Sequence, residues 1–412
     1  MTYRGYFYIL NIRKIGDKMQ RLKVGLFIDT FYPMIDGVIN VVNNYAVNLS
    51  EYADVTVFCP KGLDKNYKDD FPYKVVRCKS LKFVGFEYTI PAPFLDRKFK
   101  KAIKDANLDI IHIHSPFAVG KTGVKFAKKL GIPCIGHLHS QYYQDFKKAT
   151  HLTGLSKILL ATIIKVFNKC DVCWSVNDGV SELFRKEYKL KAPVRVHPNA
   201  TDFLPLTNPD EAKSEIDDLY GLHNEKNVFC FVGRLTALKN VFFIADALKI
   251  ASDKGLDFKM LFVGSGFQEK ELRKKIRDFE LDDKVIFTGN VSDKEMLKKI
   301  YSRSDLLLFP SPYDTDGLVK YEAASQQTPT VSVNGLFCSS NLIDNVTGFL
   351  SENSPDDFAE KIIRVCSDEK LLNTVKENVF KDLYTTWKDT VLNSYKCYIQ
   401  LVEDKKKAIT ER

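Results

Sequence analysis

Short apolar runs alternate with longer amphipathic stretches along most of the chain. In the first half, runs typical of buried strands lie near residues 23–29, 55–58, 110–114, 134–138 and 172–176. In the second half they lie near residues 228–233, 259–264, 285–288, 306–310 and 330–333. Apolar residues recur at helical spacing between them, for example in residues 40–50, 118–130, 240–254 and 294–303. This alternation predicts βαβ units and parallel sheets.

The alternation breaks once, in the turn-rich segment 198–208 (PNATDFLPLTN), which we interpret as a linker. A chain of 412 residues is long for a single core. We therefore predict an extension at 1–18, a Rossmann-like acceptor domain at 19–200, a Rossmann-like nucleotide-sugar domain at 201–385, and a final helix at 386–412. Residues 1–18 carry no convincing secretion signal, and no apolar run reaches the length of a membrane span.

Candidate chemistry concentrates where two of the predicted strands end. Residues 233–240 (GRLTALKN) follow one strand and place Arg234 and Lys239 at its carboxyl end. Residues 311–329 (SPYDTDGLVKYEAASQQTP) follow another and carry Asp314 and Glu322. Parallel sheets bind ligands at these ends, where cations and a helix N-terminus suit a pyrophosphate and carboxylates suit sugar hydroxyls. The combination indicates a nucleotide-sugar site.

These motifs resemble the signatures of retaining glycosyltransferases of family 4. The family pattern E-x-F-G-L-x-x-x-E-A reads DTDGLVKYEA here from Asp314, and G-R-L/F-x-x-x-K-N is intact from Gly233. The resemblance implies an α/β structure of the GT-B type, with two Rossmann-like domains whose parallel sheets face across a cleft. It also implies that the C-terminal helix crosses back to the first domain.

The same resemblance assigns roles to ten residues. It implies that the catalytic residues are His139, Arg234, Lys239 and Asp314, with the two cations stabilising charge on the leaving phosphate. It implies that the donor is bound by Gly37, Gly264, Gly317, Leu318, Val319 and Glu322, with Glu322 on the ribose and the backbone amides of Leu318 and Val319 on the phosphate.

Four histidines, His112, His114, His137 and His139, alternate at the ends of two predicted strands. No carboxylate or thiol cluster accompanies them at ligand spacing, so we predict no metal site. His139 matches the active-site histidine of many family members. For His114 a place on the cleft wall and a structural role remain equally open.

The chain departs from the family pattern at several positions. Asp314 is one methylene shorter than the usual Glu, Asp316 replaces the usual Phe, and Gln327 replaces the usual Gly. These departures leave the donor sugar open, and Asp316 is a candidate to share the work of Asp314. They also motivate the hypothesis of an inactive GT-B protein that binds sugar nucleotides.

Charge and composition bear on the acceptor. The net charge is +9, and residues 142–168 combine lysines with apolar residues at helical spacing. Family members that act on lipids use this region against the membrane, whereas an interior helix is the competing interpretation. Residues 27–33 (FIDTFYP) and 139–146 (HSQYYQDF), with the net charge, resemble bacterial diacylglycerol glucosyltransferases. This resemblance implies a UDP-sugar donor, a lipid acceptor and an anionic membrane surface. The alternative acceptor is a cell-surface polysaccharide or teichoic acid.

The remaining expectations concern cofactors and location. We expect no obligatory metal or other cofactor and no nucleic-acid partner. The nine cysteines are odd in number and show no paired framework, which indicates reduced thiols in the cytosol. We therefore expect a cytoplasmic enzyme that is peripheral at the inner face of the membrane.

Overall fold

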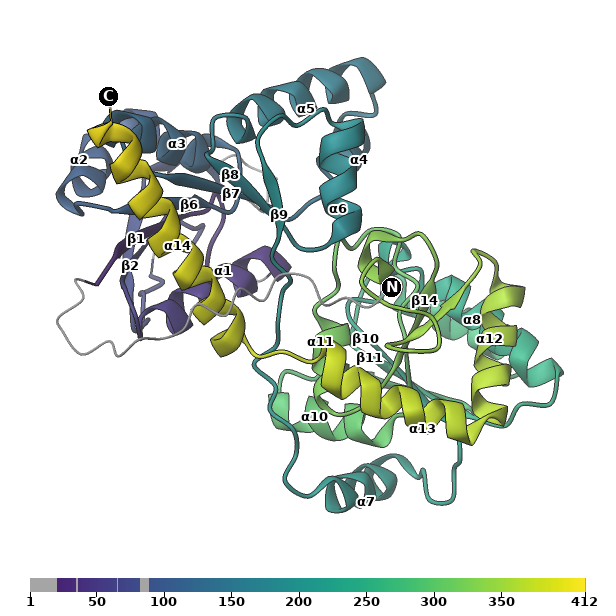
Figure 1. Ribbon diagram of the computed structural model, residues 1–412. Helices are drawn as coiled ribbons and strands as arrows, with labels where there is room; N and C mark the ends of the chain where they lie inside the picture. The colour runs from purple at the N-terminus through teal and green to yellow at the C-terminus, as the bar shows by residue number, and fades with distance from the viewer. Residues whose placement is uncertain (1–20, 35, 65, 82–88, 412) are drawn as a thin grey trace.

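The computed structural model describes residues 21–34, 36–64, 66–81 and 89–411, and it contains two large parallel sheets, one from each half of the chain (Figure 1). In spatial order the first sheet consists of β3 (Lys74–Cys78), β2 (Asp54–Pro60), β1 (Lys23–Phe27), β6 (Ile110–Ile113), β7 (Cys134–Leu138), β8 (Val172–Ser175) and β9 (Val194–Val196). The second consists of β12 (Val285–Gly289), β11 (Lys259–Val263), β10 (Val228–Val232), β13 (Leu306–Leu308), β14 (Thr330–Val333) and β15 (Phe349–Ser351). The predicted α/β class is confirmed.

Helices cover the faces of both sheets. Those of the first half are α1 (Gly37–Leu49), α2 (Arg97–Asp105), α3 (Ala118–Leu130), α4 (Tyr142–Thr150), α5 (Thr153–Phe167) and α6 (Asp178–Glu182). Those of the second half are α7 (Pro209–Tyr220), α8 (Val241–Asp253), α9 (Glu269–Asp278), α10 (Lys294–Arg303), α11 (Val319–Ser325), α12 (Pro355–Ser367), α13 (Glu369–Asn378) and α14 (Trp387–Thr410). A small antiparallel pair, β4 (Ser80–Leu81) and β5 (Ile90–Pro91), lies apart from the large sheets.

Local sequence explains where many of these elements begin and end. The central strands are buried along their length, as in β10, because helices cover both faces of a parallel sheet. Asp36 and Asn208 cap α1 and α7 by accepting hydrogen bonds from backbone N–H groups. Gly131 and Gly221 end α3 and α7 in the left-handed conformation that favours glycine.

Three strands of the two large sheets were not predicted from the sequence, and neither was the small pair β4 and β5. The strands β3, β9 and β15 lie at the edges of the two sheets and have only three to five residues. The strands β3 and β9 are partly exposed and lack the continuous apolar run that marks a central strand, and β15 is too short to show one. The stretch 142–168 is also two helices, α4 and α5, rather than one.

The C-terminal helix α14 crosses back to the first domain, as predicted, and lies along it in Figure 1. Its residues Trp387, Val391 and Tyr398 share a core with Tyr45 of α1 and with Trp174 of β8. The chain thus crosses between the domains twice, and the two crossings pair: Thr201 N donates to Thr385 O and Trp387 N donates to Thr201 O, both at 3.1 Å. No described helix is long and apolar enough to cross a membrane.

We predict that Trp387→Ala destabilises the first domain, although this residue follows the second domain in the sequence. Trp387 is 2% exposed, and removing a buried Trp side chain costs about 3–5 kcal/mol. Urea unfolding followed by a probe in the first domain measures this loss. The matched control is Lys388→Ala on the exposed face, and equal stability of the two variants would contradict the packing role of α14.

Candidate active site

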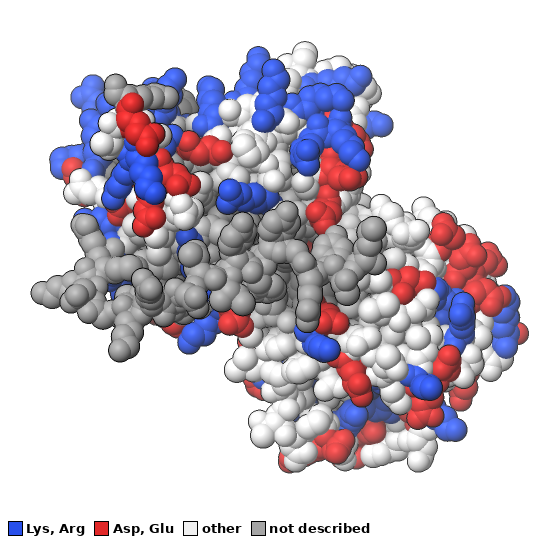
Figure 2. All heavy atoms as spheres, in the orientation of Figure 1, with Lys and Arg blue, Asp and Glu red and all other residues white. Residues whose placement is uncertain are grey.

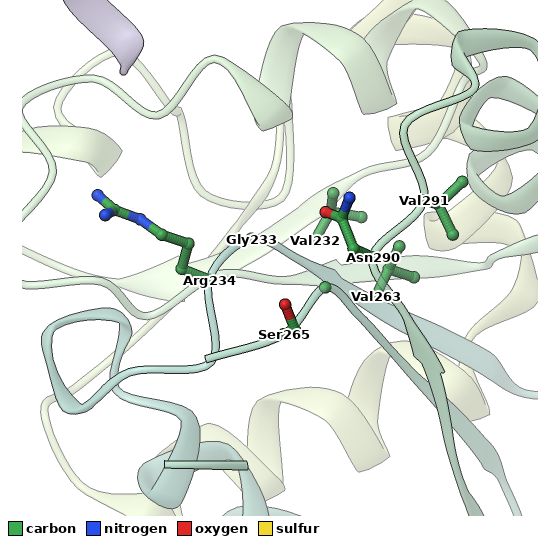
Figure 3. Close-up of a pocket in the computed structure, with 8 residues that line it drawn as sticks. Val232, Gly233, Arg234, Val263, Ser265, Asn290 and Val291 are labelled. Carbon is green, nitrogen blue, oxygen red and sulfur yellow. The ribbon is translucent and has the colours of Figure 1, made fainter. Parts of the chain in front are cut away.

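A cavity of about 570 Å³ lies between the two sheets and is lined by both halves of the chain. The first half contributes the start of α1 and the residues that follow β7, and the second half contributes the turns after β10 and β13 and the start of α11. A smaller cavity of about 230 Å³ adjoins it and shares Val232, Gly233 and Arg234 with it (Figure 3). Both cavities therefore lie at carboxyl ends of parallel strands, where such sheets bind ligands.

The structure brings the predicted site residues together around these two cavities. Nine of the ten line the larger cavity: Gly37, His139, Arg234, Lys239, Asp314, Gly317, Leu318, Val319 and Glu322. The tenth, Gly264, lines the smaller cavity beside Arg234. Their placement is thus consistent with one site, while their individual roles stay predictions.

The two cations differ in their surroundings. Arg234 is exposed, and its guanidinium makes no hydrogen bond or ion pair with the part of the chain that the structure describes. Figure 3 shows Arg234 extending away from Gly233, with Asn290 and Val291 on the opposite side of the cavity. Lys239 Nζ instead lies 2.6 Å from both carboxylate oxygens of Asp314. The charge of Arg234 is therefore free to bind an anion, whereas the charge of Lys239 is already paired with the Asp314 carboxylate.

The carboxylate of Asp314 is held by its own domain. Besides Lys239, it accepts a hydrogen bond from Ser311 Oγ at 2.5 Å. The Lys239–Asp314 pair was not predicted, because the two residues are far apart in the sequence and each was assigned to a different part of the ligand.

Glu322 is partly buried at the start of α11 and accepts a hydrogen bond from Tyr301 Oη at 2.9 Å. Burial raises the pKa of Glu322 to about 7, because desolvation disfavours the charged form more than the Tyr301 bond stabilises it. Close to Glu322, the backbone N–H groups of Leu318 and Val319 donate no hydrogen bond within the described chain. The turn before α11 therefore presents free donors to the cavity.

Asp316 also lines the larger cavity, and the role considered for it beside Asp314 stays a prediction. Its Oδ1 accepts hydrogen bonds from Lys320 Nζ at 2.6 Å and Tyr321 Oη at 3.0 Å, and its Oδ2 accepts one from Asn199 Nδ2 at 2.7 Å. The Asp316 and Lys320 side chains are 3% and 1% exposed. Because both oxygens are engaged in this buried network, Asp316 anchors the turn that precedes α11.

The four histidines lie on β6 and β7 or directly after them, and their rings pack against one another. Of the four, His139 lines the cavity. His139 Nε2 lies 3.1 Å from His114 Nδ1, which leaves Nδ1 of His139 for a ligand. Burial lowers the pKa of His139 to about 3, so its ring is neutral at physiological pH. His114 thus lies behind His139 in a structural position.

His112, His114 and His137 place one nitrogen each within 4.8 Å of the others, and all three are buried beneath α1 and α14. Their rings pack closely, with centroids of His112 and His114 4.1 Å apart. Three neighbouring ring nitrogens are also ligands that a metal ion could use, so the predicted absence of a metal site stays a prediction. The rings belong to an aromatic cluster that includes Tyr45 and Trp174.

Sequence reasoning missed several residues of the cleft. Gln141, Asp145, Asn199 and Tyr313 line the larger cavity and make hydrogen bonds between the two domains. The only sequence signal was the family-like H-S-x-Y-Y-x-D-F segment that begins at His139 and contains Gln141 and Asp145.

Two family models match the chain in tandem. "Glycosyltransferase Family 4" matches residues 35–203, and "Glycosyl transferases group 1" matches residues 212–382. The gap between the two matches overlaps the segment 198–208 that was interpreted as the linker, and each match covers most strands of one of the two sheets.

Relatives and solved structures are similar over nearly the full length. The chain is 26% identical to alpha-monoglucosyldiacylglycerol synthase of Streptococcus pneumoniae, over 90% of this chain and 87% of the relative. It is 28% identical to the Escherichia coli UDP-Gal:alpha-D-GlcNAc-diphosphoundecaprenol alpha-1,3-galactosyltransferase, over 84% and 88%. Anabaena HepE, solved in complex with UDP, superposes with a TM-score of 0.69 at 16% identity, over 95% of this chain and 100% of HepE. The GT-B fold is confirmed.

We predict that alanine substitution destabilises the protein at Gly264 but not at Gly37. An added Cβ at Gly264, where φ is +127°, would lie 2.0 Å from Gly233 O, so Gly264→Ala should cost about 2 kcal/mol or more. At Gly37 an added Cβ meets nothing within 4 Å, so Gly37→Ala should keep its stability while narrowing the cavity. Thermal unfolding measures the stability of both variants, and UDP titration measures the effect of the narrower cavity in Gly37→Ala. An unstable Gly37→Ala variant would contradict the open position of this residue.

We also predict a pH dependence of stability that originates at Glu322. Because its folded-state pKa is about 7 and the ordinary pKa of a Glu side chain is 4.5, the stabilising contribution is complete below pH 4.5 and is lost as the pH rises through 7. Relative to Glu322→Gln, the wild type should lose up to about 3 kcal/mol between pH 4.5 and 8. Urea midpoints at several pH values test this, and parallel pH profiles of the two proteins would contradict it.

Proposed function

The chain belongs to glycosyltransferase family 4, and on this premise we propose that it transfers a hexose, glucose first of all, from a UDP-sugar to a membrane lipid such as diacylglycerol. The proposal includes retention of the anomeric configuration, as the family resemblance implies. The observation that carries it is the convergence of Arg234, Lys239, Asp314, Glu322 and His139 around one cavity between two parallel sheets.

In this proposal, different residues bind the pyrophosphate, the ribose and the sugar of the donor. Arg234 has a free guanidinium, and the unbonded N–H groups of Leu318 and Val319 lie near it around the same cavity, which suits a pyrophosphate. Negative charge grows on the phosphate as it leaves, so fixed cations stabilise the transition state more than the ground state. Glu322 would accept hydrogen bonds from the ribose hydroxyls and Asp314 from the donor sugar.

We propose front-face attack for the chemical step. The acceptor hydroxyl attacks the sugar carbon on the face from which the phosphate departs, and a phosphate oxygen takes the hydroxyl proton. This step uses no protein nucleophile. His139, kept neutral by burial, contributes a hydrogen bond and no charge. We further propose that Arg234 and Lys239 supply the positive charge at the phosphate, so that no divalent metal is obligatory.

The acceptor proposal draws on the surface of the first domain. Leu152 is 60% exposed and Ile158 63% exposed, and both lie at the outer side of α4 and α5 next to Lys147, Lys148 and Lys157. Figure 2 shows Lys and Arg side chains gathered over this part of the molecule. Exposed apolar residues beside cations suit the surface of an anionic membrane. In the C-terminal half of α5, apolar residues such as Ile163 and Phe167 are instead buried, as expected for an interior helix.

The relatives support the same class of acceptor. The Streptococcus pneumoniae protein is named for a glucosyl-diacylglycerol product, and the Escherichia coli protein for a lipid-linked GlcNAc acceptor. We therefore place the enzyme in the cytoplasm, peripheral at the inner face of the membrane. The alternative function is the glycosylation of a cell-surface polysaccharide or teichoic acid, and the second alternative is an inactive sugar-nucleotide binder.

A donor and acceptor screen tests the proposal. The purified protein is mixed with UDP-glucose, UDP-galactose, UDP-N-acetylglucosamine or GDP-mannose, with and without diacylglycerol in anionic micelles, and UDP release and glycolipid are measured. We expect UDP-glucose turnover that depends on the lipid. Arg234→Ala and Lys239→Ala should each lower turnover by about 100-fold or more, because each removes charge from the phosphate site.

The controls separate the alternatives. Lys249→Ala removes a cation from an i,i+4 pair on α8 and should leave turnover unchanged. Turnover without lipid dependence would contradict the lipid acceptor and favour a glycan. Binding of UDP without release from any donor would contradict catalysis and favour the inactive binder.

A further inference from the structure

One loop of the second domain, residues 312–316, is bonded to the first domain at almost every position. On one side, Gln141 Nε2 donates hydrogen bonds to the carbonyl oxygens of Pro312 at 3.2 Å and Tyr313 at 2.9 Å. The Tyr313 hydroxyl donates to Asp145 Oδ1 at 2.7 Å. Gln141 precedes α4 and Asp145 lies on it, so this side of the loop is attached to a single helix of the first domain.

The other end of the loop is attached at separate points. Thr315 Oγ1 donates to the carbonyl oxygen of His139 at 2.6 Å. Asn177 Nδ2 donates to Thr315 O at 2.7 Å, and Asn199 Nδ2 donates to Asp316 Oδ2 at 2.7 Å. The loop therefore depends on the first domain for its conformation at both ends.

Asp314 lies in the middle of this loop and is the exception. Among the described residues, its side chain bonds to Lys239 and Ser311, both in its own domain. The residues before and after it are fixed by the first domain, so the backbone of Asp314 is held from both sides. A carboxylate one methylene shorter than the family's usual Glu has less reach, which makes the backbone position more consequential.

We propose that Gln141 and Asp145 are positioning residues, which hold the 312–316 loop so that the Asp314 carboxylate meets the donor sugar. This inference rests on the proposed function. Separation of the domains would break these bonds and release Asp314, so sugar transfer occurs only in the closed arrangement. The same helix α4 leads through residues 151–152 into α5, so the acceptor-side surface and the donor-sugar contact share one structural support.

The nucleotide contacts do not depend on the bonds that Gln141 and Asp145 make with the loop. Glu322 is bonded to Tyr301 of its own domain, and Gly264 is packed against Gly233 of the neighbouring turn. Arg234 has no partner within the described chain. Loss of the interdomain bonds should therefore reduce sugar transfer while UDP affinity stays the same. A residue with a merely structural role would impair both.

The experiment is a double-mutant cycle on the full-length protein. Tyr313→Phe and Asp145→Ala are measured singly and together with UDP-glucose, for kcat, KM and UDP affinity. Each single variant should lower kcat about tenfold, because it removes one hydrogen bond to a charged group, while the dissociation constant of UDP stays within about twofold. The double variant should be no worse than the poorer single variant, because both changes remove the same bond.

Two further variants complete the test. Gln141→Met removes both donated bonds at similar side-chain volume and should also lower kcat without weakening UDP binding. Tyr143→Phe removes a hydroxyl from the same helix that bonds nothing on the second domain among the described residues, and it should behave as wild type. Losses that multiply in the double variant, or UDP affinity that falls in parallel with kcat, would overturn the positioning role.

Hydrogen–deuterium exchange distinguishes this inference from the proposed function. Exchange of the peptide covering residues 311–317 should be faster in Tyr313→Phe than in wild type, whether or not the protein turns over a sugar nucleotide. If the wild type proved inactive with every donor, the proposed function would fail, and unchanged exchange in this peptide would separately overturn the interdomain attachment.

Discussion

The donor side of the cleft depends on one buried ion pair, Lys320 with Asp316. All three protons of the Lys320 ammonium are used, since Nζ lies 2.6 Å from Asp316 Oδ1, 2.8 Å from Cys338 O and 2.6 Å from Asn341 Oδ1. Burying two charges is costly, and removing one partner of such a pair typically costs about 3–5 kcal/mol. Full satisfaction of the pair thus fixes the turn from Asp316 to Val319, whose N–H groups face the cavity.

This pair also explains a departure from the family pattern. Where the family usually has Phe, this chain has Asp316, and a lysine follows four positions later on α11. An apolar contact holds a turn through shape alone, whereas a charged group can also bond a distant amide. Asp316 does so with Asn199 in the segment between the domains. The substitution therefore adds a directional tie between the linker and the phosphate-facing turn.

The sequence was sufficient for the fold and for most of the site, because both follow from local pattern. Central strands such as β10 are recognisable as continuous apolar runs. Residues at the carboxyl ends of parallel strands lie at the same edge of the sheet, so the motifs there are predicted to meet. Interactions between residues far apart in the sequence could not be predicted in this way. The Lys239–Asp314 pair spans two motifs, and the bonds of Gln141 and Asn199 connect separate domains. Edge strand β9 was missed because it is short and partly exposed.

The return of α14 to the first domain has a consequence for the synthesis of the protein. Trp387, Tyr398 and Val402 complete a core whose other members, such as Val24 and Ile39, are made before the whole second domain. The second domain draws its core from a contiguous stretch of chain, from Phe203 to Leu383. On the ribosome the second domain therefore has all its parts first. The core that α14 completes in the first domain must wait until this helix has emerged.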